Sequence, residues 1–536
     1  MLATMLSYEA ERQMFRSLEA APENTHEARA RHTQLLRFTR TDGRLTGMPV
    51  LGLLYPCTTL ARECDPLRVA QQPGTGELPT IEQTVETCRQ RVEDLLATLE
   101  GGQASTTGPA DESWYWAAPI LIDLAHDADN TRAWLDSGKL AARWAGTEPS
   151  AVDEEGSLWS EHVDQARKLL TEPHGLGPRP PDLALVLAQM AIAGPAISAL
   201  RALGRRSADP SALGLGALRD AAGQIGWAFR SLFNQPEVMA LIRGMNRQEP
   251  YWRRVLEYCL AGGLQSVLDE YVHVLGDSVV KPDSSIEKAA ADIAEVIQRS
   301  LAIRTVALAA DDIRVAASGA SVDMESRRLR ARFALRLEGD ESDGLEGATR
   351  RDQVREAFNS PFWPFVLATT SVGQEGLDFH PYCHAVVHWN LPANPVDLEQ
   401  REGRVHRYKG HAVRRNLASH YADALPRLGP GDPWRTLFEL AVESRAPGTS
   451  DIVPFWVYSA DGGVKIERHV PALPLSREFA QLAALRRSLA IYRMIFGQPR
   501  QEDLIAYLLE HFAPDDIKRM TSELRIDLTP SRPANE

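Results

Sequence analysis

Apolar and charged residues recur at helical spacing over much of the first half of the chain. The stretches Tyr8–Ala20 and Thr80–Leu99 show this spacing, and residues 182–276 continue it in the manner of a helical bundle. The pattern therefore predicts a helical N-terminal region over residues 1–100 and a second helical region over residues 110–280.

Three segments interrupt this helical pattern. Met48–Tyr55 is a short, continuous apolar run between a glycine and a proline, for which we expect a strand. Gly101–Pro109 is small and polar, which is typical of a linker. Thr171–Asp182 holds four prolines and two glycines, so we expect a loop there.

From about residue 284 the pattern changes to helices that alternate with short apolar runs, as βαβ units require. Asp352–Phe358 is a predicted helix. The predicted strands are Arg304–Leu308, Arg332–Arg336, Phe365–Thr369 and Ala385–Trp389. Short apolar runs of this kind suit buried parallel strands. We therefore predict a parallel α/β domain over residues 285–425.

The remainder of the chain predicts a mixed α+β extension over residues 426–528. Phe455–Tyr458 and Val464–Ile466 flank Asp461-Gly462-Gly463, which indicates a hairpin. Ser476 is a candidate cap for an amphipathic helix. Its expected apolar face is formed by Phe479, Leu482, Leu485, Leu489 and Tyr492. Residues 529–536 predict a disordered tail.

Composition and charge exclude some classes of protein. With 59 basic and 72 acidic residues the net charge is −13, which excludes a uniformly basic nucleic-acid coat protein but not a local basic groove. Five cysteines without C-x-x-C spacing exclude a disulfide scaffold and argue against a structural zinc site. These counts, and an N-terminus without signal-peptide features, favour a cytoplasmic protein.

The most apolar stretch, Leu183–Leu200, approaches the length of a membrane span. It is rich in alanine, carries Gln189 and Ser198, and is broken by Gly194-Pro195. A proline in the middle of such a stretch ends or kinks a helix. We therefore predict a buried core helix and no membrane partner.

The first candidate for chemistry is the run Thr369–Phe379, which follows a predicted strand. Hydroxyls and glycines at the carboxyl end of a parallel strand suit phosphate contact, because glycine lets backbone N–H groups approach an anion. Asp378 could accept a hydrogen bond from a ribose hydroxyl. Ser/Gly-rich loops follow many strands, so this run alone is a weak signal.

The second candidate is Gln400–Arg407. Arg404 and Arg407 are three residues apart, so on a helix they would share one face. Paired guanidiniums can stabilise charge on a transferring phosphoryl group. Leu398–Ala418 carries six basic and two acidic residues, a local charge of +4 within an acidic chain. This contrast favours a phosphate-facing surface, to which Arg414 and Arg415 would contribute.

These two segments resemble motifs V and VI of superfamily 2 helicases, in order and at the usual separation. Gln400–Arg407 matches the Q-x-x-G-R-x-x-R pattern at every fixed position, and Val386–Pro395 between them resembles the strand and turn of Swi/Snf-type and bacterial RapA-like ATPases. The resemblance covers about residues 350–420. It implies that residues 285–425 form the second RecA-like lobe, or helicase C-terminal domain.

Residue roles follow from the resemblance by motif position. Arg404 and Arg407 would be catalytic arginine fingers, and Thr369 and Thr370 would contact the nucleic-acid backbone. The residues implied at ATP are Gln400, Gly403, Gly376 and Asp378. The cofactors implied are ATP and Mg²⁺, and the partner implied is nucleic acid, in particular double-stranded DNA.

The chain departs from the family in one respect. A complete motor has a first lobe with a G-x-x-x-x-G-K-[ST] loop and a D-E-x-x box. The sequence has no such loop, and Leu268–His273 resembles a D-E-x-H box only superficially because its neighbours recur at helical spacing. We therefore expect a partner chain to supply the first lobe and to share ATP and Mg²⁺. The alternatives are a non-enzymatic nucleic-acid-binding or regulatory subunit and the remnant of a truncated helicase gene.

Two further groups of residues carry weaker signals. Five tryptophans between Trp114 and Trp159 predict an aromatic core rather than a base-stacking surface. Five histidines between His380 and His411 lack the spacing of a known metal motif. We expect no metal site among them.

Overall fold

The structure is a computed structural model. It describes residues 34–71, 78–99, 108–146, 154–171, 175–207, 209–244, 248–302, 306–315, 322–331, 352–368, 381–427, 429, 431–471, 477–494 and 501–523. The chain divides into two compact units. Unit 1 consists of Met1–Phe365 and Ala424–Thr436, and unit 2 of Val366–Asp423 and Leu437–Glu536. The predicted tail over residues 529–536, the predicted helix over Tyr8–Ala20 and residues 101–107 of the predicted linker lie outside the described residues.

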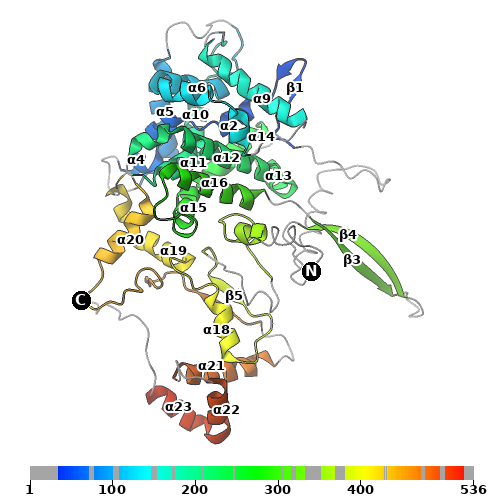
Figure 1. The fold of residues 1–536 in the computed structure, drawn as a ribbon, viewed down its shortest axis with the longest axis vertical. Coiled ribbons are helices and arrows are strands. Elements are labelled where there is room, and N and C mark those ends of the chain that lie inside the picture. The colour runs from blue at the N-terminus through cyan, green and yellow to red at the C-terminus, as the bar shows by residue number, and fades with distance from the viewer. Residues whose placement is uncertain are drawn as a thin grey trace. The chain divides into compact units, whose positions relative to one another are not determined.

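Unit 1 is a helical assembly, as the apolar pattern predicts (Figure 1). Its longer helices are α5 (Ile81–Ala97), α6 (Trp114–His126), α9 (Glu154–Arg167), α10 (Leu183–Ala193), α11 (Pro195–Gly204), α12 (Gly216–Phe233), α14 (Tyr251–Ala261), α15 (Leu264–Ser278) and α16 (Ile286–Leu301). Shorter elements are β1 (Arg40–Thr41), β2 (Arg44–Leu45), α2 (Met48–Leu54), α3 (Thr58–Glu63), α4 (Pro66–Ala70), α7 (Ala128–Leu135), α8 (Leu140–Ala145), η1 (Lys168–Leu170), η2 (Pro210–Gly214) and α13 (Pro236–Arg243).

The apolar run over Met48–Tyr55 is helical, so the predicted strand is wrong. Periodicity cannot separate a fully buried helix from a buried strand, and α2 buries six of its seven residues. Pro49 lies in the first turn, where its missing N–H costs nothing. The predicted helix over Thr80–Leu99 is confirmed as α5. Thr80 and Gln83 form a capping box at its N-terminus.

The stretch Leu183–Leu200 forms two core helices. α10 and α11 meet at Gly194 with a bend of 45°, and both are almost completely buried. The loop predicted from the prolines precedes them, and its described part is not helical. Within the described ranges no single helix is long and apolar enough to cross a membrane, although this bent pair passes by length and composition.

The tryptophans form the aromatic core that the sequence predicts. Trp114, Trp134 and Trp144 are at most 3% exposed. The rings of Trp134 and Trp144 lie 5.2 Å apart, and those of Trp144 and Trp159 lie 5.1 Å apart. Arg219 places its guanidinium 4.3 Å from the Trp134 ring centroid. Buried rings cannot serve as a base-stacking surface.

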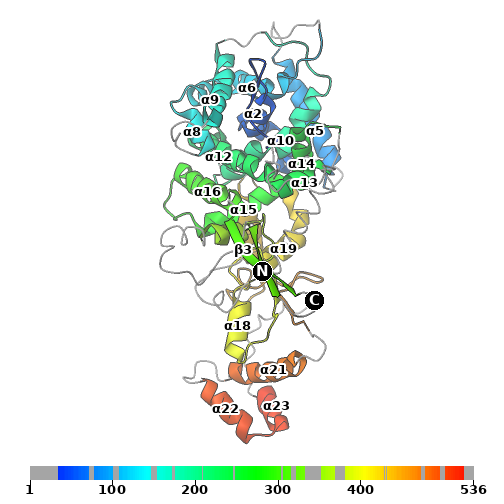
Figure 2. The ribbon, with the colours of Figure 1, turned by 90° about the vertical axis from the view of Figure 1, so that its right-hand side faces the viewer.

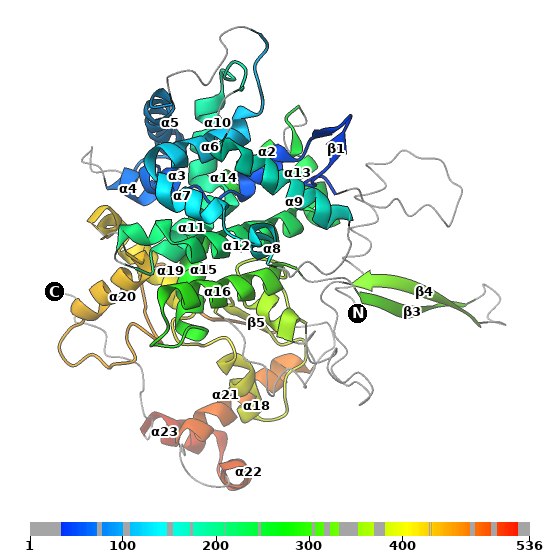
Figure 3. The ribbon, with the colours of Figure 1, turned by 45° about the horizontal axis from the view of Figure 1, so that its top comes forward.

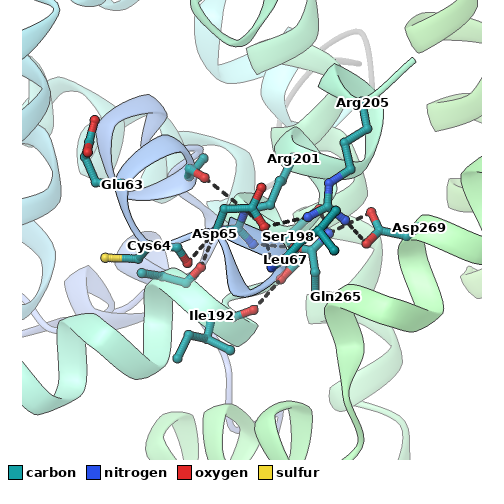
Figure 4. A network of polar contacts seen from close by, with 12 residues as sticks. Glu63, Cys64, Asp65, Leu67, Ile192, Ser198, Arg201, Arg205, Gln265 and Asp269 are labelled. Atoms are coloured by element: carbon teal, nitrogen blue, oxygen red, sulfur yellow. Dashed lines mark hydrogen bonds and ion pairs between the residues drawn. The ribbon is translucent and has the colours of Figure 1, made fainter. Parts of the chain in front are cut away.

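A buried polar network ties α4, α11 and α15 together (Figure 4). Arg205 pairs with Asp65, at 2.6 Å, and with Asp269. Arg201 donates to the backbone carbonyl of Ala61 at 2.9 Å and also to Gln265. Burial raises the pKa of Asp269 to about 6, although the nearby Arg205 acts in the opposite direction. Asp269 is thus a structural residue on a helix, and the argument against a D-E-x-H box is confirmed.

The region over residues 285–331 differs from the predicted parallel domain. α16 packs beside α12 in unit 1, so the chain does not divide near residue 285 (Figure 2). β3 (Val306–Val315) and β4 (Val322–Ala331) pair as antiparallel strands (Figure 3). Only residues 316–321 separate them, which is too short for the crossover that parallel strands need. The predicted strand Arg332–Arg336 lies outside the described residues.

Unit 2 contains the only parallel pair that the structure describes. β5 (Ala385–Val387) confirms one predicted strand, and its parallel partner is β6 (Glu467–His469) from the predicted extension. Phe365–Ala368, the described part of another predicted strand, has no strand structure. The helices of this unit are α18 (Pro395–Gly403), α19 (His411–His420), α21 (Glu478–Met494), α22 (Gln501–His511) and α23 (Pro514–Glu523). η5 (Ala422–Arg427) and α20 (Pro433–Glu443) cross the division between the units.

The predicted hairpin in the extension is wrong, although its turn exists. Gly462 takes φ +69°, a backbone conformation that glycine adopts freely. The flanking segments are joined by a side chain instead of a strand ladder. Asn416 on α19 donates to the carbonyls of Tyr458 and Val464 and accepts from the Val464 N–H. The predicted face of α21 holds only in part, because Leu485 and Leu489 are buried whereas Phe479 is 79% exposed.

Candidate functional site

The helix that carries the Q-x-x-G segment is α18. Asn394 caps it by accepting a hydrogen bond from the Asp397 N–H at 2.8 Å, and Pro395 occupies its first turn. Leu398 is completely buried in a cluster with Leu391 and Leu485 of α21. α18 and α21 therefore lie side by side (Figure 2), with the Leu398 face of α18 turned inward.

Gln400 and Gly403 lie on the accessible side of α18. Both are exposed, and a Cβ atom placed on Gly403 would meet nothing within 4 Å. No packing requirement within the described residues explains this glycine. The last turn of α18 thus leaves open space, which is compatible with the close approach of a ligand.

Arg404 and Arg407 do not share a helix face, so that prediction is wrong. α18 ends at Gly403, Arg404 is its C-cap, and the chain leaves the helix before Arg407. A tight turn follows, in which Lys409 has φ +49° and the Gly410 N–H donates to the carbonyl of Arg407. Both arginines remain partly exposed. Their proximity now depends on the turn rather than on helical spacing.

The Glu402 carboxylate inside the motif is held by His388, which follows β5, and by Arg468 of β6; the sequence analysis did not predict either contact. Glu402 lies 3.2 Å from His388 Nε2, and it accepts two hydrogen bonds from the Arg468 guanidinium. Burial alone would raise the pKa of Glu402, but hydrogen bonds from His388 and Arg468 outweigh it and lower the pKa to about 2. No sequence signal links Arg468 to this motif, because 66 positions separate it from Glu402.

Arg414 and Arg415, both predicted to contact nucleic acid, have different surroundings. Arg414 is fully buried and donates to the carbonyls of Lys409, at 2.6 Å, and Pro381, at 2.8 Å. Its guanidinium therefore holds the turn after Arg407 instead of facing solvent. Arg415, the next residue of α19, is exposed and available to a phosphate.

Thr369, Thr370, Gly376 and Asp378 lie outside the described residues, as does His380.

The other histidines of the predicted group go to separate partners. His388 contacts Glu402, and His406 contacts the carbonyl of Trp456 at 2.9 Å. The rings of His384 and His411 lie 5.3 Å apart. In the part of the chain that the structure describes, no group of three or more His, Cys, Asp or Glu residues is arranged to hold a metal ion.

Comparison with known proteins supports the identity of this segment. No curated protein and no solved structure matches the chain. One family model, described as the helicase conserved C-terminal domain, matches residues 321–409. The match implies a RecA-like α/β fold and ends two residues after Arg407. Residues 321–409, which contain α18 and the turn after it, therefore correspond to a helicase conserved C-terminal domain.

Proposed function

We propose that this chain is the C-terminal half of an ATP-dependent superfamily 2 translocase that acts on nucleic acid. The observation that carries the proposal is the complete Q-x-x-G-R-x-x-R pattern inside the matched segment. Gln400 and Gly403 are exposed at the end of α18, and Arg404 and Arg407 follow in a partly exposed turn. Two cations beside an open helix end suit a nucleoside triphosphate.

A partner chain would supply the other half of the site. The sequence contains no phosphate loop, so no residue of this chain takes the role of the lysine and hydroxyl that hold the β- and γ-phosphates and Mg²⁺. Within the complex, Arg404 and Arg407 would stabilise the charge that develops on the transferring phosphoryl group. The Swi/Snf-type or RapA-like character and a preference for double-stranded DNA belong to this proposal.

The test is an ATPase measurement on the purified chain with and without its partner. The partner to use is the product of an adjacent gene that encodes a phosphate loop and a D-E-x-x box. We expect background turnover from the chain alone and DNA-stimulated turnover from the mixture. Robust ATP turnover by the chain alone that is abolished by a substitution within residues 1–280 would disprove the proposal that two chains share the ATPase site.

Nucleic-acid binding is tested separately, by measuring how the affinity depends on salt concentration. Phosphate contacts release counterions, so affinity for duplex DNA should fall steeply between about 50 and 200 mM salt. Arg415→Ala should lower the slope of log affinity against log salt by about 1. Arg477→Ala, which changes another exposed arginine of unit 2, is the matched control. An affinity that does not change with salt would contradict this surface.

A second candidate function is a non-enzymatic nucleic-acid-binding subunit. The absence of a phosphate loop favours it. It predicts the same salt-dependent binding but no turnover with any partner lobe. The two measurements together therefore separate a partnered motor from a binding subunit.

A further inference from the structure

Two exposed aromatic side chains from distant segments meet beside the turn that follows α18 and contains Arg407. Tyr408 is 47% exposed and Trp456 is 41% exposed. Their ring centroids lie 6.0 Å apart at an interplanar angle of 67°. We call this pair the Tyr408–Trp456 platform. Large exposed aromatic surfaces cost free energy in water, so a pair of them beside a functional motif indicates a binding surface.

One backbone hydrogen bond and one side-chain contact to a backbone carbonyl join the two halves of the platform. The Lys409 N–H donates to the carbonyl of Phe455 at 2.6 Å, and His406 Nε2 lies 2.9 Å from the carbonyl of Trp456. The buried Arg414 holds the carbonyl of Lys409. The backbone segments that carry the two rings are therefore fixed relative to each other.

A column of aromatic rings supports the platform from within unit 2. Tyr408 stacks on Phe455 with centroids 5.6 Å apart and an interplanar angle of 15°. Phe455 stacks in turn on Phe438, at 5.8 Å and 6°, and Phe438 belongs to the buried cluster with Leu417. Phe455 thus covers one face of the tyrosine ring, and 47% of Tyr408 remains exposed.

The segment that carries Tyr408 is basic. Arg404, Arg407, Lys409 and Arg415 occur with no acidic residue among positions 404–415. Lys409 Nζ lies 5.6 Å from the Tyr408 ring centroid. The adjacent carboxylate of Glu402 is already paired with Arg468 and His388. A ligand that combines flat apolar faces with negative charges matches this combination.

We propose that the Tyr408–Trp456 platform stacks unpaired bases of single-stranded nucleic acid, with the strand phosphates near Arg407 and Lys409. Base stacking on aromatic side chains beside a basic surface is the general mode of sequence-tolerant single-strand binding. A duplex cannot use the platform in this way, because its base faces are already stacked. The inference rests on the proposed function, since it assigns a strand-binding surface to the same lobe.

The experiment compares two labelled 15-nucleotide strands in fluorescence anisotropy, oligo(dT) and an abasic strand with the same backbone. The intact chain should bind oligo(dT) more tightly than the abasic strand. Tyr408→Leu with Trp456→Leu removes the aromatic faces but keeps apolar volume. This double variant should weaken oligo(dT) binding at least about 5-fold and leave abasic binding unchanged.

Two further variants make the result specific. Tyr408→Phe keeps a ring and should bind oligo(dT) as the intact chain does. Phe479→Ala removes an aromatic residue that is 79% exposed elsewhere in unit 2, and it should have no effect. Thermal denaturation of each variant checks that it is folded.

The outcomes distinguish this inference from the proposed function. Equal affinity for oligo(dT) and the abasic strand would overturn the proposal that the platform stacks bases. If Arg415→Ala still weakened binding of each strand, phosphate binding by the lobe would remain supported. Competition of oligo(dT) by free dTMP at comparable concentration would also overturn the platform, because the site would then hold a mononucleotide. Absence of binding to both strands would overturn the platform, whereas the ATPase and duplex-binding measurements decide the proposed function independently.

Discussion

Glu402 occupies a position that the Q-x-x-G-R-x-x-R pattern leaves variable, yet its contacts hold the end of α18 in place. Its carboxylate anchors the last turn of α18 to His388, the residue after β5, and to Arg468 of β6. Because α18 ends one residue later, this anchor sets where the chain leaves the helix and hence where Arg404 begins the turn.

The first prediction concerns the two arginines that we assign to catalysis. Arg404→Ala or Arg407→Ala should reduce turnover of the reconstituted complex by about 10³-fold or more, because each removes charge stabilisation from the transition state. Arg→Lys should restore little, since an ammonium group lacks the planar fork. Steady-state turnover and the melting temperature are measured on the same variants. Lower melting temperatures with normal turnover per folded molecule would show that these residues only brace the lobe.

The second prediction concerns Glu402 and acid. Its pKa is about 2, below the usual carboxyl value, so its contribution to stability is complete above that usual value and is lost as the pH falls toward 2. Arg468→Ala should cost roughly 1.5–3 kcal/mol at pH 7 and should flatten the acid-induced loss of stability below the usual carboxyl pKa, because Glu402 then has less stabilisation to lose. Urea denaturation of unit 2 across pH measures both effects. Arg477→Ala is the exposed control, and an unchanged acid profile in Arg468→Ala would contradict the assignment.

The break between α10 and α11 illustrates how an element boundary is specified. Gly194 closes α10 by donating its N–H to the carbonyl of Met190 at 2.7 Å, and Pro195 begins α11. A Cβ atom at Gly194 would lie 2.5 Å from that same carbonyl oxygen. The glycine is therefore required by close backbone approach, and the bend keeps both helices buried.

The third prediction follows from this contact. Gly194→Ala should destabilise unit 1 by about 1–3 kcal/mol, because the clash is with backbone that cannot move freely inside the core. Gly138→Ala is the control, since a Cβ there meets nothing within 4 Å. Urea denaturation followed by tryptophan fluorescence measures both variants. Equal midpoints for the two would show that the bend tolerates a side chain.

The chain crosses between the two units more than once, so neither unit is a single stretch of sequence. The return segment Ala424–Thr436 belongs to unit 1. Its partly buried Asp432 contacts His273 Nδ1 of α15 at 2.6 Å and accepts a hydrogen bond from the Trp434 N–H. Burial would raise the pKa of Asp432, but the hydrogen bond from His273 outweighs it and lowers the pKa.

The fourth prediction tests this return segment. Asp432→Ala should destabilise unit 1 by about 1.5–3 kcal/mol at pH 7, because it leaves the buried His273 without this partner. The stabilisation from Asp432 should be lost as the pH falls below the usual carboxyl range, since its folded pKa is lowered. Calorimetry at several pH values measures the loss. Asp283→Ala, at an exposed position, should leave the transition unchanged, and an equal effect of both substitutions would refute the role of Asp432.

Local patterns specify much of this molecule. Helical spacing predicts α5 and the helix that contains Asp269, and the apolar run interrupted by Gly194-Pro195 predicts the buried core that α10 and α11 form, since each depends on residues close in sequence. The Q-x-x-G-R-x-x-R pattern likewise identifies the segment that matches the helicase domain. A functional motif that is defined by residue types at short spacing can therefore be identified from the sequence alone.

Long-range pairing decides the rest. The pairing of β5 with β6, the anchoring of Glu402 by Arg468 and the meeting of Tyr408 with Trp456 join positions dozens of residues apart. The end of α18 before Arg404 and the burial of Arg414 also depend on such partners. A single sequence carries no periodic signal for them, because which distant groups meet is settled by how the units pack and not by local preference.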